Sequence, residues 1–453
     1  MSASHDRRGA PSRATPAVTV VIPTRNRRAS LCRTLEALAR QTFPVSDFEV
    51  IVAADGCTDD TAAAVERFDA PYALRLVQLP GSGAATARNR GAAEARGRLL
   101  LFVDDDVEPS PGLIAAHVEA HGRARAGGAG VSNSARTDVV GIGPCLPVLV
   151  GRVGLFQRKL RSWWVSEYER LARPGHRFTY RDVLSGNLSI GAEHFRRLGG
   201  FDTAFHGAAE DWEFGVRLVK SDAELVYVGA AVAWHHIDLG LERSFQRTRH
   251  EGRADVLMGL RHPELRPVLP LAQGLDAHGA ERLCRMGAFR APVLGDLVVK
   301  VLGWQLRVHE ALRMRRAWQG LSGLIRRYWY WRGVAEELGR SGSGPAEFVA
   351  AAADAGAPEP VSLDVDLANG LDVAEDMIDL VRPDALCLYH EGREIGELPP
   401  VPGAERLRGR HLRPLLFERF GRELIGVLAV AEVQGRVRAG RHPTPLHPEE
   451  VAR

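Results

Sequence analysis

The stretch LLLFVDDDVEP, residues 99–109, decides the fold of the N-terminal half, because an apolar run ends there in three consecutive aspartates. A short, strongly apolar run is typical of a strand buried in a sheet. Adjacent carboxylates repel one another, and a carboxylate at the end of a buried strand is destabilising unless a cation faces it. The sequence therefore predicts a buried strand whose end binds a cation.

Strands and helices alternate upstream of this run with short links between them. The expected strands cover residues 18–23, 48–55, 74–79 and 98–103, with a helix between each pair. This alternation indicates a parallel sheet covered by helices, in which ligands gather at the carboxyl ends of the strands. Polar clusters follow three of the four strands, at residues 23–26, Asp55-Gly56 and Asp104–Asp106. We expect an α/β, Rossmann-like domain with one site at this sheet edge.

Composition excludes several classes of protein. The chain has 453 residues, a net charge of +3 and a hydrophobic content of 45%, so a soluble protein of two or three domains is expected. The mild excess of positive charge argues against a nucleic-acid partner. The five cysteines are widely spaced, which is typical of reduced thiols and predicts a cytoplasmic location. The apolar stretch that begins at Pro292 is interrupted by charges and is too short to span a bilayer.

The pattern suggests five segments along the chain. They are a disordered arm at 1–16, the α/β domain at 17–265, a helical extension at 266–340, a linker at 341–360 and a small α/β module at 361–453. Two interpretations of the helical extension remain open. Its arginines and aromatics either pack with their stems over apolar surface, or residues 290–332 contact an anionic membrane surface peripherally.

Two chemistries fit a strand that ends in Asp-x-Asp. In the first, the carboxylates hold Mn²⁺ or Mg²⁺, which bridges a nucleoside diphosphate. In the second, one aspartate is the nucleophile of a metal-dependent phosphohydrolase. The second pattern requires Thr or Val where this chain has Glu108, so its fit is incomplete.

An ordered set of motifs resembles the family 2 glycosyltransferases, which are inverting enzymes of the GT-A fold. The set comprises VVIPTRNR, VAADGCTDDT, ARNRGAAEARG, LLFVDDDVEP, SGNLSI, GGFD, AEDWEFGVRL and a later WHH, and it spans about residues 18–245. The resemblance implies a nucleoside-diphosphate-sugar donor, a divalent metal, and a glycan, glycolipid or small molecule as acceptor.

The resemblance also implies roles for individual residues. The donor pocket would be lined by Pro23, Thr24, Arg25, Asn26 and Asp55, with Arg88 and Asn89 near the diphosphate and Asp104 and Asp105 at the strand end. Asp106 would ligate the metal together with His235, and His236 competes for that position. Asp105 is expected to point to the opposite face from its two neighbours.

On the acceptor side, the resemblance implies that Asp211 is the general base and that Glu210 shapes the site beside it. Trp212 would stack on a sugar ring, and Asn187 would lie near the acceptor. The segment 162–171 forms either part of the acceptor lip or a packed aromatic helix. A non-catalytic sugar-nucleotide-binding module remains an alternative, although such a module would not need a base at Asp211.

Overall fold

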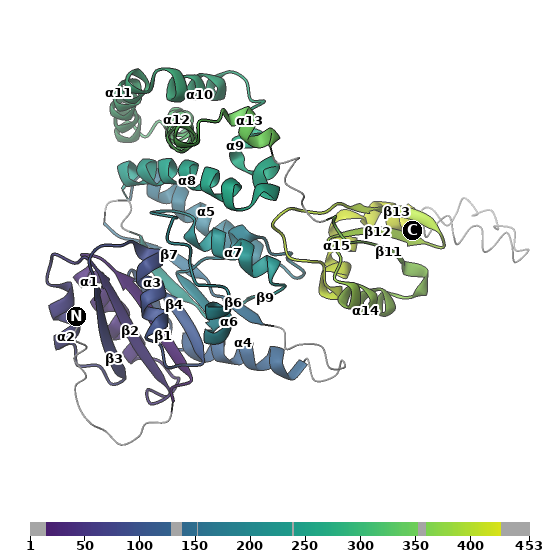
Figure 1. Cartoon of the computed structure of the whole chain (residues 1–453), viewed down its shortest axis with the longest axis horizontal. Helices are drawn as coiled ribbons and strands as arrows, with labels where there is room; N and C mark the ends of the chain where they lie inside the picture. Colours follow the sequence, from purple (N-terminus) through teal and green to yellow (C-terminus); the bar gives the residue numbers. More distant parts are fainter. Residues whose placement is uncertain (1–14, 128–137, 152, 238–239, 352–358, 427–453) are drawn as a thin grey trace, which may run out of the picture. The chain divides into compact units, whose positions relative to one another are not determined.

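The computed structural model describes residues 15–127, 138–151, 153–237, 240–351 and 359–426. The expected arm at 1–16 lies almost entirely outside these ranges. The chain divides into two compact units. The first runs to Ala172 and from Phe178 to Ala357, and the second combines residues 173–177 with the chain from Pro358 onwards. The sheet domain and the helical extension thus belong to one unit (Figure 1).

The first unit is built on a seven-stranded sheet with the order β3-β2-β1-β4-β8-β6-β9. Its strands are β1 (Val18–Thr24), β2 (Phe48–Asp55), β3 (Ala73–Leu79), β4 (Leu99–Val103), β6 (Val139–Ile142), β8 (Asn187–Gly191) and β9 (Glu224–Tyr227). Strands β1 to β4 are mutually parallel, whereas β8 runs antiparallel to both β4 and β6. The predicted α/β class is confirmed, with a sheet that is parallel in its N-terminal half and mixed beyond it.

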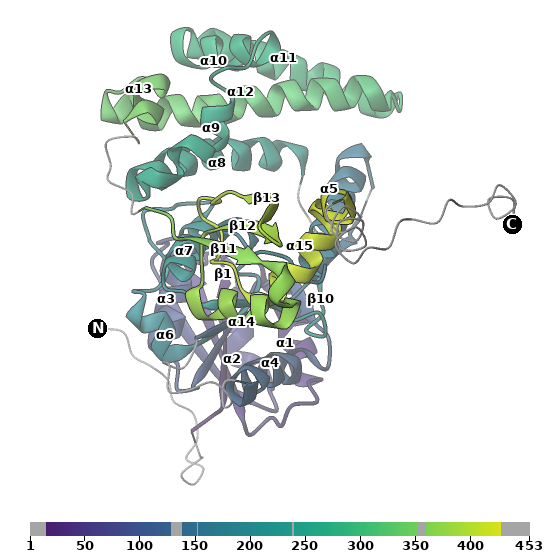
Figure 2. The ribbon, with the colours of Figure 1, turned by 90° about the vertical axis from the view of Figure 1, so that its right-hand side faces the viewer.

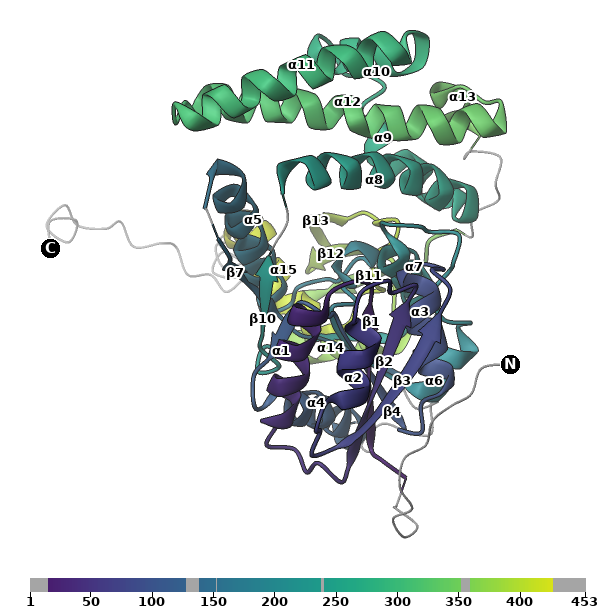
Figure 3. The same cartoon turned by 90° about the vertical axis from the view of Figure 1, so that its left-hand side faces the viewer.

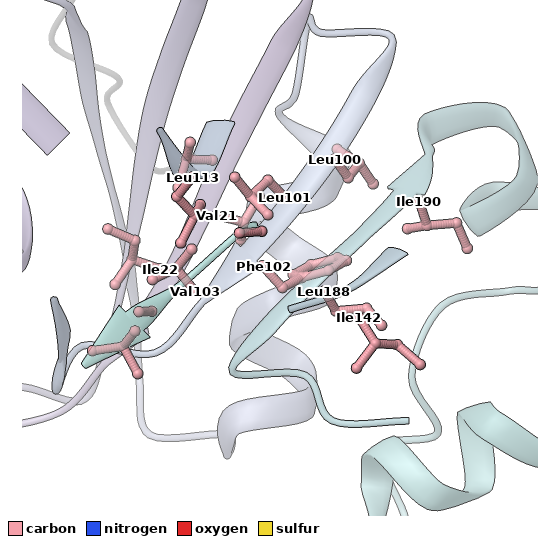
Figure 4. Packing of buried hydrophobic residues seen from close by; sticks show 14 of the residues in the cluster. Val21, Ile22, Leu100, Leu101, Phe102, Val103, Leu113, Ile142, Leu188 and Ile190 are labelled. Atoms are coloured by element: carbon pink, nitrogen blue, oxygen red, sulfur yellow. The ribbon is translucent and has the colours of Figure 1, made fainter. Parts of the chain in front are cut away.

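The apolar run of β4 lies in the middle of this sheet, between β1 and β8. All five of its side chains are buried. They pack among the buried residues of β1 and β8, including Val21, Ile22 and Leu188 (Figure 4). Burial on both faces explains why this strand carries no polar residue before Asp104.

Helices cover the sheet on both sides of the strands. These are α1 (Arg28–Ala39), α2 (Thr61–Arg67), α3 (Ala84–Ala93), α4 (Leu113–Gly127), α6 (Ala192–Arg197) and α7 (Glu210–Lys220). A second sheet has the order β5-β10-β7 and consists of β5 (Val107–Pro109), β10 (Ala233–Ile237) and β7 (Cys145–Leu149). Strand β5 follows the three aspartates directly, so β4 and β5 hold them between two sheets.

The remaining part of the first unit is a layer of helices with its own apolar core. It contains α5 (Leu155–Leu171), α8 (Leu241–Arg261), α9 (Pro270–Gln273), α10 (Ala280–Arg290), α11 (Pro292–Ala311), α12 (Arg315–Ser341) and α13 (Pro345–Ala350). Figures 2 and 3 show α8 on one side of α12, with α10 and α11 on the other. None of the helices within the described ranges is long and apolar enough to cross a membrane.

The second unit contains a three-stranded sheet with the order β11-β12-β13. Its elements are β11 (Ser362–Asp366), α14 (Leu371–Val381), β12 (Ala385–His390), β13 (Arg393–Leu398) and α15 (Leu412–Arg419). Residues 173–177 join it, because Arg177 Nε donates to the carbonyl oxygen of Glu405. The accessory module was expected from residue 361, and the part of the second unit that the structure describes there contains α14 as a further helix.

One local expectation differs from the structure. The linker expected at 341–360 contains α13, whose Phe348 is buried beneath the guanidinium of Arg266. His235 and His236, the two candidates for the metal position, both lie within β10. A strand places consecutive side chains on opposite faces, so His235 and His236 face different partners.

Candidate active site

The polar clusters predicted from the sequence meet at one edge of the sheet, where β1, β2 and β4 end. Thr24 lies opposite Ala54 in the register of β1 and β2, so Asp55 follows one residue beyond Thr24. Thr24 Oγ1 donates to Asp105 at 2.7 Å. This bond joins the ends of β1 and β4 and brings the loops after the two strands together.

The three aspartates after β4 have three different sets of partners. Asp104 accepts from Arg88 at 2.6 Å. Asp105 is buried and accepts from Thr24 and, at 3.1 Å, from Arg27. Asp106 accepts from Arg27 on one oxygen, and its other oxygen lies 3.4 Å from His235 Nε2. Asp105 and Asp106 thus accept from the same guanidinium nitrogen of Arg27, so the expectation that Asp105 points to the opposite face from both neighbours does not hold for Asp106.

Arg27 is the residue that the sequence analysis missed. The resemblance placed Arg25 in the donor pocket. Both arginines are exposed, but it is Arg27 that forms ion pairs with Asp105 and Asp106. The signal was present in the run of arginines after the first strand, but only the fold shows which of them contacts the aspartates. The negative charges that appeared to need a metal are therefore already balanced in part by Arg27 and Arg88.

Burial and hydrogen bonding separate the pKa values of two adjacent carboxyls. Burial raises the pKa of Asp105 to about 6, against the opposing charge of Arg27. Burial acts in the same direction on Asp106, but the hydrogen bonds and charges of His235 and Arg27 outweigh it and lower its pKa to about 2. Asp106 is therefore ionised at neutral pH, as a metal ligand must be.

The loops of the expected donor pocket bind to one another. Asp55 accepts from the backbone amides of Ser82 and Gly83 at 2.6 and 2.7 Å. Asn26 Oδ1 accepts from the amide of Thr58 at 2.7 Å, and Asn26 itself has a left-handed φ of 53°. Pro23 is buried within β1. Asp55 and Asn26 therefore hold the walls of this pocket in place, where direct contact with the nucleotide was expected.

Arg88 and Asn89 of α3 also act on the protein itself. Arg88 is buried and donates to both Asp104 and, at 3.0 Å, Glu210, so it joins the end of β4 to the start of α7. Asn89 donates to and accepts from the backbone of Phe201 at 2.8 Å each. These contacts give both residues a positioning role, where the resemblance implied proximity to the diphosphate.

The two histidines of β10 face different carboxylates. His235 faces Asp106, whereas His236 Nε2 lies 2.8 Å from Glu108 Oε2. Asp106 and His235 supply one oxygen and one nitrogen donor, which suits Mn²⁺ and Mg²⁺ as far as two ligands can. Among the described residues, no three or more His, Cys, Asp or Glu side chains are grouped so that they could hold a metal ion. A metal here would need oxygens from the substrate.

Asp211 differs from the aspartates of β4. It lies in the first turn of α7, after Ala209, which has a left-handed φ of 65°. Its Oδ1 accepts only from the adjacent amide of Trp212, and no described cation lies within ion-pair distance. Burial and then the charge of Glu210 raise the pKa of Asp211 to about 7, although Arg88 and Arg247 oppose the shift.

Asp106, His235 and Asp211 line the same cavity, which has a volume of about 760 Å³. Much of its remaining wall is formed by α5, α8 and α12. Aromatic and cationic side chains dominate that wall, namely Trp163 and Trp164 of α5, Arg243 and Arg247 of α8, and Trp318 and Arg326 of α12. The segment 162–171 therefore lines the cavity as part of α5.

The two residues expected on the acceptor side are placed differently. Trp212 lines the cavity, and the guanidinium of Arg181 lies 5.2 Å from its ring centre, so one ring face is already covered. Asn187 is 1% exposed, and its amide bonds to His117 and to the carbonyl of Ala231. The polar atoms of Asn187, which was expected near the acceptor, therefore hold the end of β8.

Comparison with known proteins identifies the domain that carries this site. Residues 19–143, which contain the three aspartates, match Glycosyl transferase family 2, and residues 168–237 match the N-terminal domain of galactosyltransferase. The chain carries a family 2 glycosyltransferase domain. The second match contains both Asp211 and His235, so the two matches together include the three aspartates and these two cavity-lining residues.

Individual relatives include the validoxylamine A glucosyltransferase of Streptomyces hygroscopicus subsp. jinggangensis. It is 33% identical over 276 residues, and the match covers 56% of this chain and 63% of the relative, so the chain spans less than two thirds of that protein. Among solved structures, a Pyrobaculum calidifontis mannosyltransferase in complex with GDP-Man and Mn²⁺ aligns over 72% of this chain and 88% of its own, at 20% identity and a TM-score of 0.46.

Proposed function

We propose that the chain transfers a sugar from a nucleoside-diphosphate donor to an acceptor hydroxyl, with inversion at the anomeric carbon and Asp211 as the general base. The observation that carries this proposal is the pairing of Asp211 with Asp106 and His235 in one cavity. Carboxylates with raised pKa values in such cavities are typical of proton-transfer groups. The family 2 match supports a nucleotide-sugar donor.

The proposed reaction uses Asp211 in its ionised form. Its carboxylate accepts the proton of the acceptor hydroxyl, the hydroxyl oxygen bonds to the anomeric carbon, and the bond from that carbon to the diphosphate oxygen breaks. A base whose pKa lies near the working pH is well suited to this task, because it is largely ionised yet still basic. The pKa of about 7 for Asp211 meets that condition.

We place the divalent cation between Asp106 and His235, where it would neutralise charge on the departing diphosphate. The carboxylate of Asp106 is held ionised by its partners. Arg27 contacts the opposite oxygen of Asp106 from the one that faces His235. The arginine thereby orients the carboxylate and leaves its second oxygen directed at the histidine.

Helices α5 and α12 form the proposed acceptor subsite. Trp163 and Trp164 supply apolar ring surface on α5, and Arg326 on α12 adds a cation. Aromatic faces with a few polar groups are a common lining for sites that bind sugars and other hydroxylated molecules. A glycan, a glycolipid headgroup or a polyhydroxylated small molecule would each fit this chemistry.

The phosphohydrolase alternative gains no support from the geometry. That mechanism requires a free aspartate as nucleophile at the end of β4, whereas Asp104 and Asp105 are bonded to Arg88 and Arg27. The non-catalytic alternative leaves the raised pKa of Asp211 without a role.

The proposal is tested with Asp211→Asn, which keeps the size of the side chain but removes the base. We expect transfer to fall by roughly 10²–10⁴-fold, while donor binding, measured by calorimetry in the presence of Mn²⁺, stays unchanged. Glu210→Gln is the matched control, because an amide oxygen at that position still accepts from Arg88. Full transfer by Asp211→Asn would remove the base assignment, and phosphoester hydrolysis lost in Asp104→Asn would favour the phosphohydrolase.

A further inference from the structure

Helix α11 exposes a continuous apolar face. Eight large apolar side chains are solvent-exposed, up to 83% for Val293 and 74% for Trp304. These residues, called the α11 stripe below, are Val293, Leu294, Leu297, Val298, Val301, Trp304, Val308 and Leu312. At 100° per residue they occupy one side of the helix. Contiguous apolar surface of this kind marks an interaction site.

The opposite side of α11 already packs against α12. Val299 and Leu306 are buried there, and Tyr328 of α12 donates to Asp296 at 2.6 Å. A Cβ added to Gly295 would lie 2.5 Å from the Tyr328 side chain. Helix α11 is therefore apolar on two opposite sides, of which only one contributes to the core. The α11 stripe is not needed for folding of the described helical layer.

The charges of α11 are distributed unevenly. Lys300 and Arg307 flank the α11 stripe, whereas the two carboxylates of the helix turn inward. Asp296 bonds to Tyr328, and Glu310 accepts from the backbone amide of Leu155 at 2.9 Å. Arg307 lies 3.7 Å from Glu242 of α8 in an exposed ion pair, so the margin of the α11 stripe carries two cations against one carboxylate and its net charge is positive. A second copy of the same surface would bring like charges together, while an anionic surface would be attracted.

A basic groove continues from this helix toward the catalytic cavity. It has a volume of about 1330 Å³ and lies between α5, α11 and α12. Its lining contains five cationic side chains, Arg158, Lys159, Arg307, Arg313 and Arg315, and one carboxylate, that of Glu310. Lys159, Trp163 and Trp318 line both this groove and the catalytic cavity.

We infer that the α11 stripe docks on the surface of a bilayer containing anionic lipid, with its apolar side chains at the level of the headgroups. Amphipathic helices with Trp and Leu on one face and cations beside it bind at that depth without crossing the membrane. Lys300 and Arg307 would meet the anionic headgroups. The α11 stripe is separate from the proposed base and metal ligands, so membrane docking can be tested independently of the proposed reaction.

The test is cosedimentation of the full chain with vesicles of phosphatidylcholine, with and without phosphatidylglycerol. We expect binding to the anionic vesicles, and roughly tenfold weaker partitioning for Leu297→Glu/Val301→Glu. Leu380→Glu/Phe417→Glu is the matched control, because it adds the same charge at two exposed apolar residues of the second unit. We expect that control to bind like the wild type, and Lys300→Ala/Arg307→Ala to lose mainly the preference for phosphatidylglycerol.

Equal partitioning of the two double-glutamate variants would overturn the inference, as would failure of the wild type to bind either kind of vesicle. Light scattering without vesicles provides a second readout. A dimer that dissociates in Leu297→Glu/Val301→Glu, together with no vesicle binding, would assign the α11 stripe to a second copy of the chain.

Discussion

The aspartates at the end of β4 and the aspartate at the start of α7 share a residue type and a cavity, but their surroundings differ. Asp106 lies against Arg27 and His235, and its pKa falls to about 2. Asp211 has no cation within ion-pair distance among the described residues, and its pKa rises to about 7. The carboxylate of Asp106 therefore stays charged at neutral pH, whereas that of Asp211 can gain or lose a proton there.

This difference follows from where the chain places its arginines. Arg27 comes from the loop after β1 and Arg88 from α3, and both reach the end of β4. Arg88 also contacts Glu210 but leaves Asp211 to the cavity. Of these two neighbouring carboxylates, Glu210 is thus ion-paired, whereas Asp211 is left as the proposed base. Such separation of pKa values is how acid and base roles are assigned in enzymes.

The largest effect within this comparison is expected for Asp106→Asn. Loss of the negative charge should remove metal-stimulated transfer and lower the rate roughly 10²–10³-fold, as measured by donor turnover over a Mn²⁺ titration. Asp105→Asn is the control, because its amide oxygen can still accept from Thr24, and we expect a much smaller loss. Equal losses in both variants would contradict the separate tasks of these adjacent residues.

Arg88→Met should chiefly affect stability. It leaves Asp104 and Glu210 without their buried partner, and we expect the free energy of unfolding in urea to fall by about 3 kcal/mol. Arg90→Met in the same helix removes an exposed pair with Glu94, so a loss below about 1 kcal/mol is expected. Similar losses in the two variants would mean that Arg88 does not join β4 to α7.

Much of the fold could be predicted from the sequence, because local patterns determine it. Apolar periodicity predicts the alternating strands and helices up to β4. The resemblance predicts that Asp106 and His235 lie side by side. The choice between His235 and His236 could not be made, because it depends on where β10 begins. A shift of one residue in a strand moves every side chain to the other face.

The parts that could not be predicted depend on contacts between distant segments. Nothing near Asn187 in the sequence shows that its amide bonds to His117, or that Asp55 binds the loop at Ser82. The catalytic cavity was also missed, because its walls come from α5, α8 and α12. Only the packing of these three helices shows that their residues line the same cavity as Asp211.

The pH dependence of transfer is the most direct test of the claim that Asp211 has a raised pKa and acts as the base. Because its pKa is raised to about 7, kcat/KM should rise as pH increases through that value, where the carboxyl loses its proton. The same shift means that this group's contribution to the free energy of unfolding falls over the range from its unfolded pKa up to about 7. The account predicts that the rising limb is present in the wild type, moves to lower pH in Glu210→Gln because the charge of Glu210 is lost, and is absent from the residual activity of Asp211→Asn. A flat wild-type profile, or a limb that persists in Asp211→Asn, would contradict it.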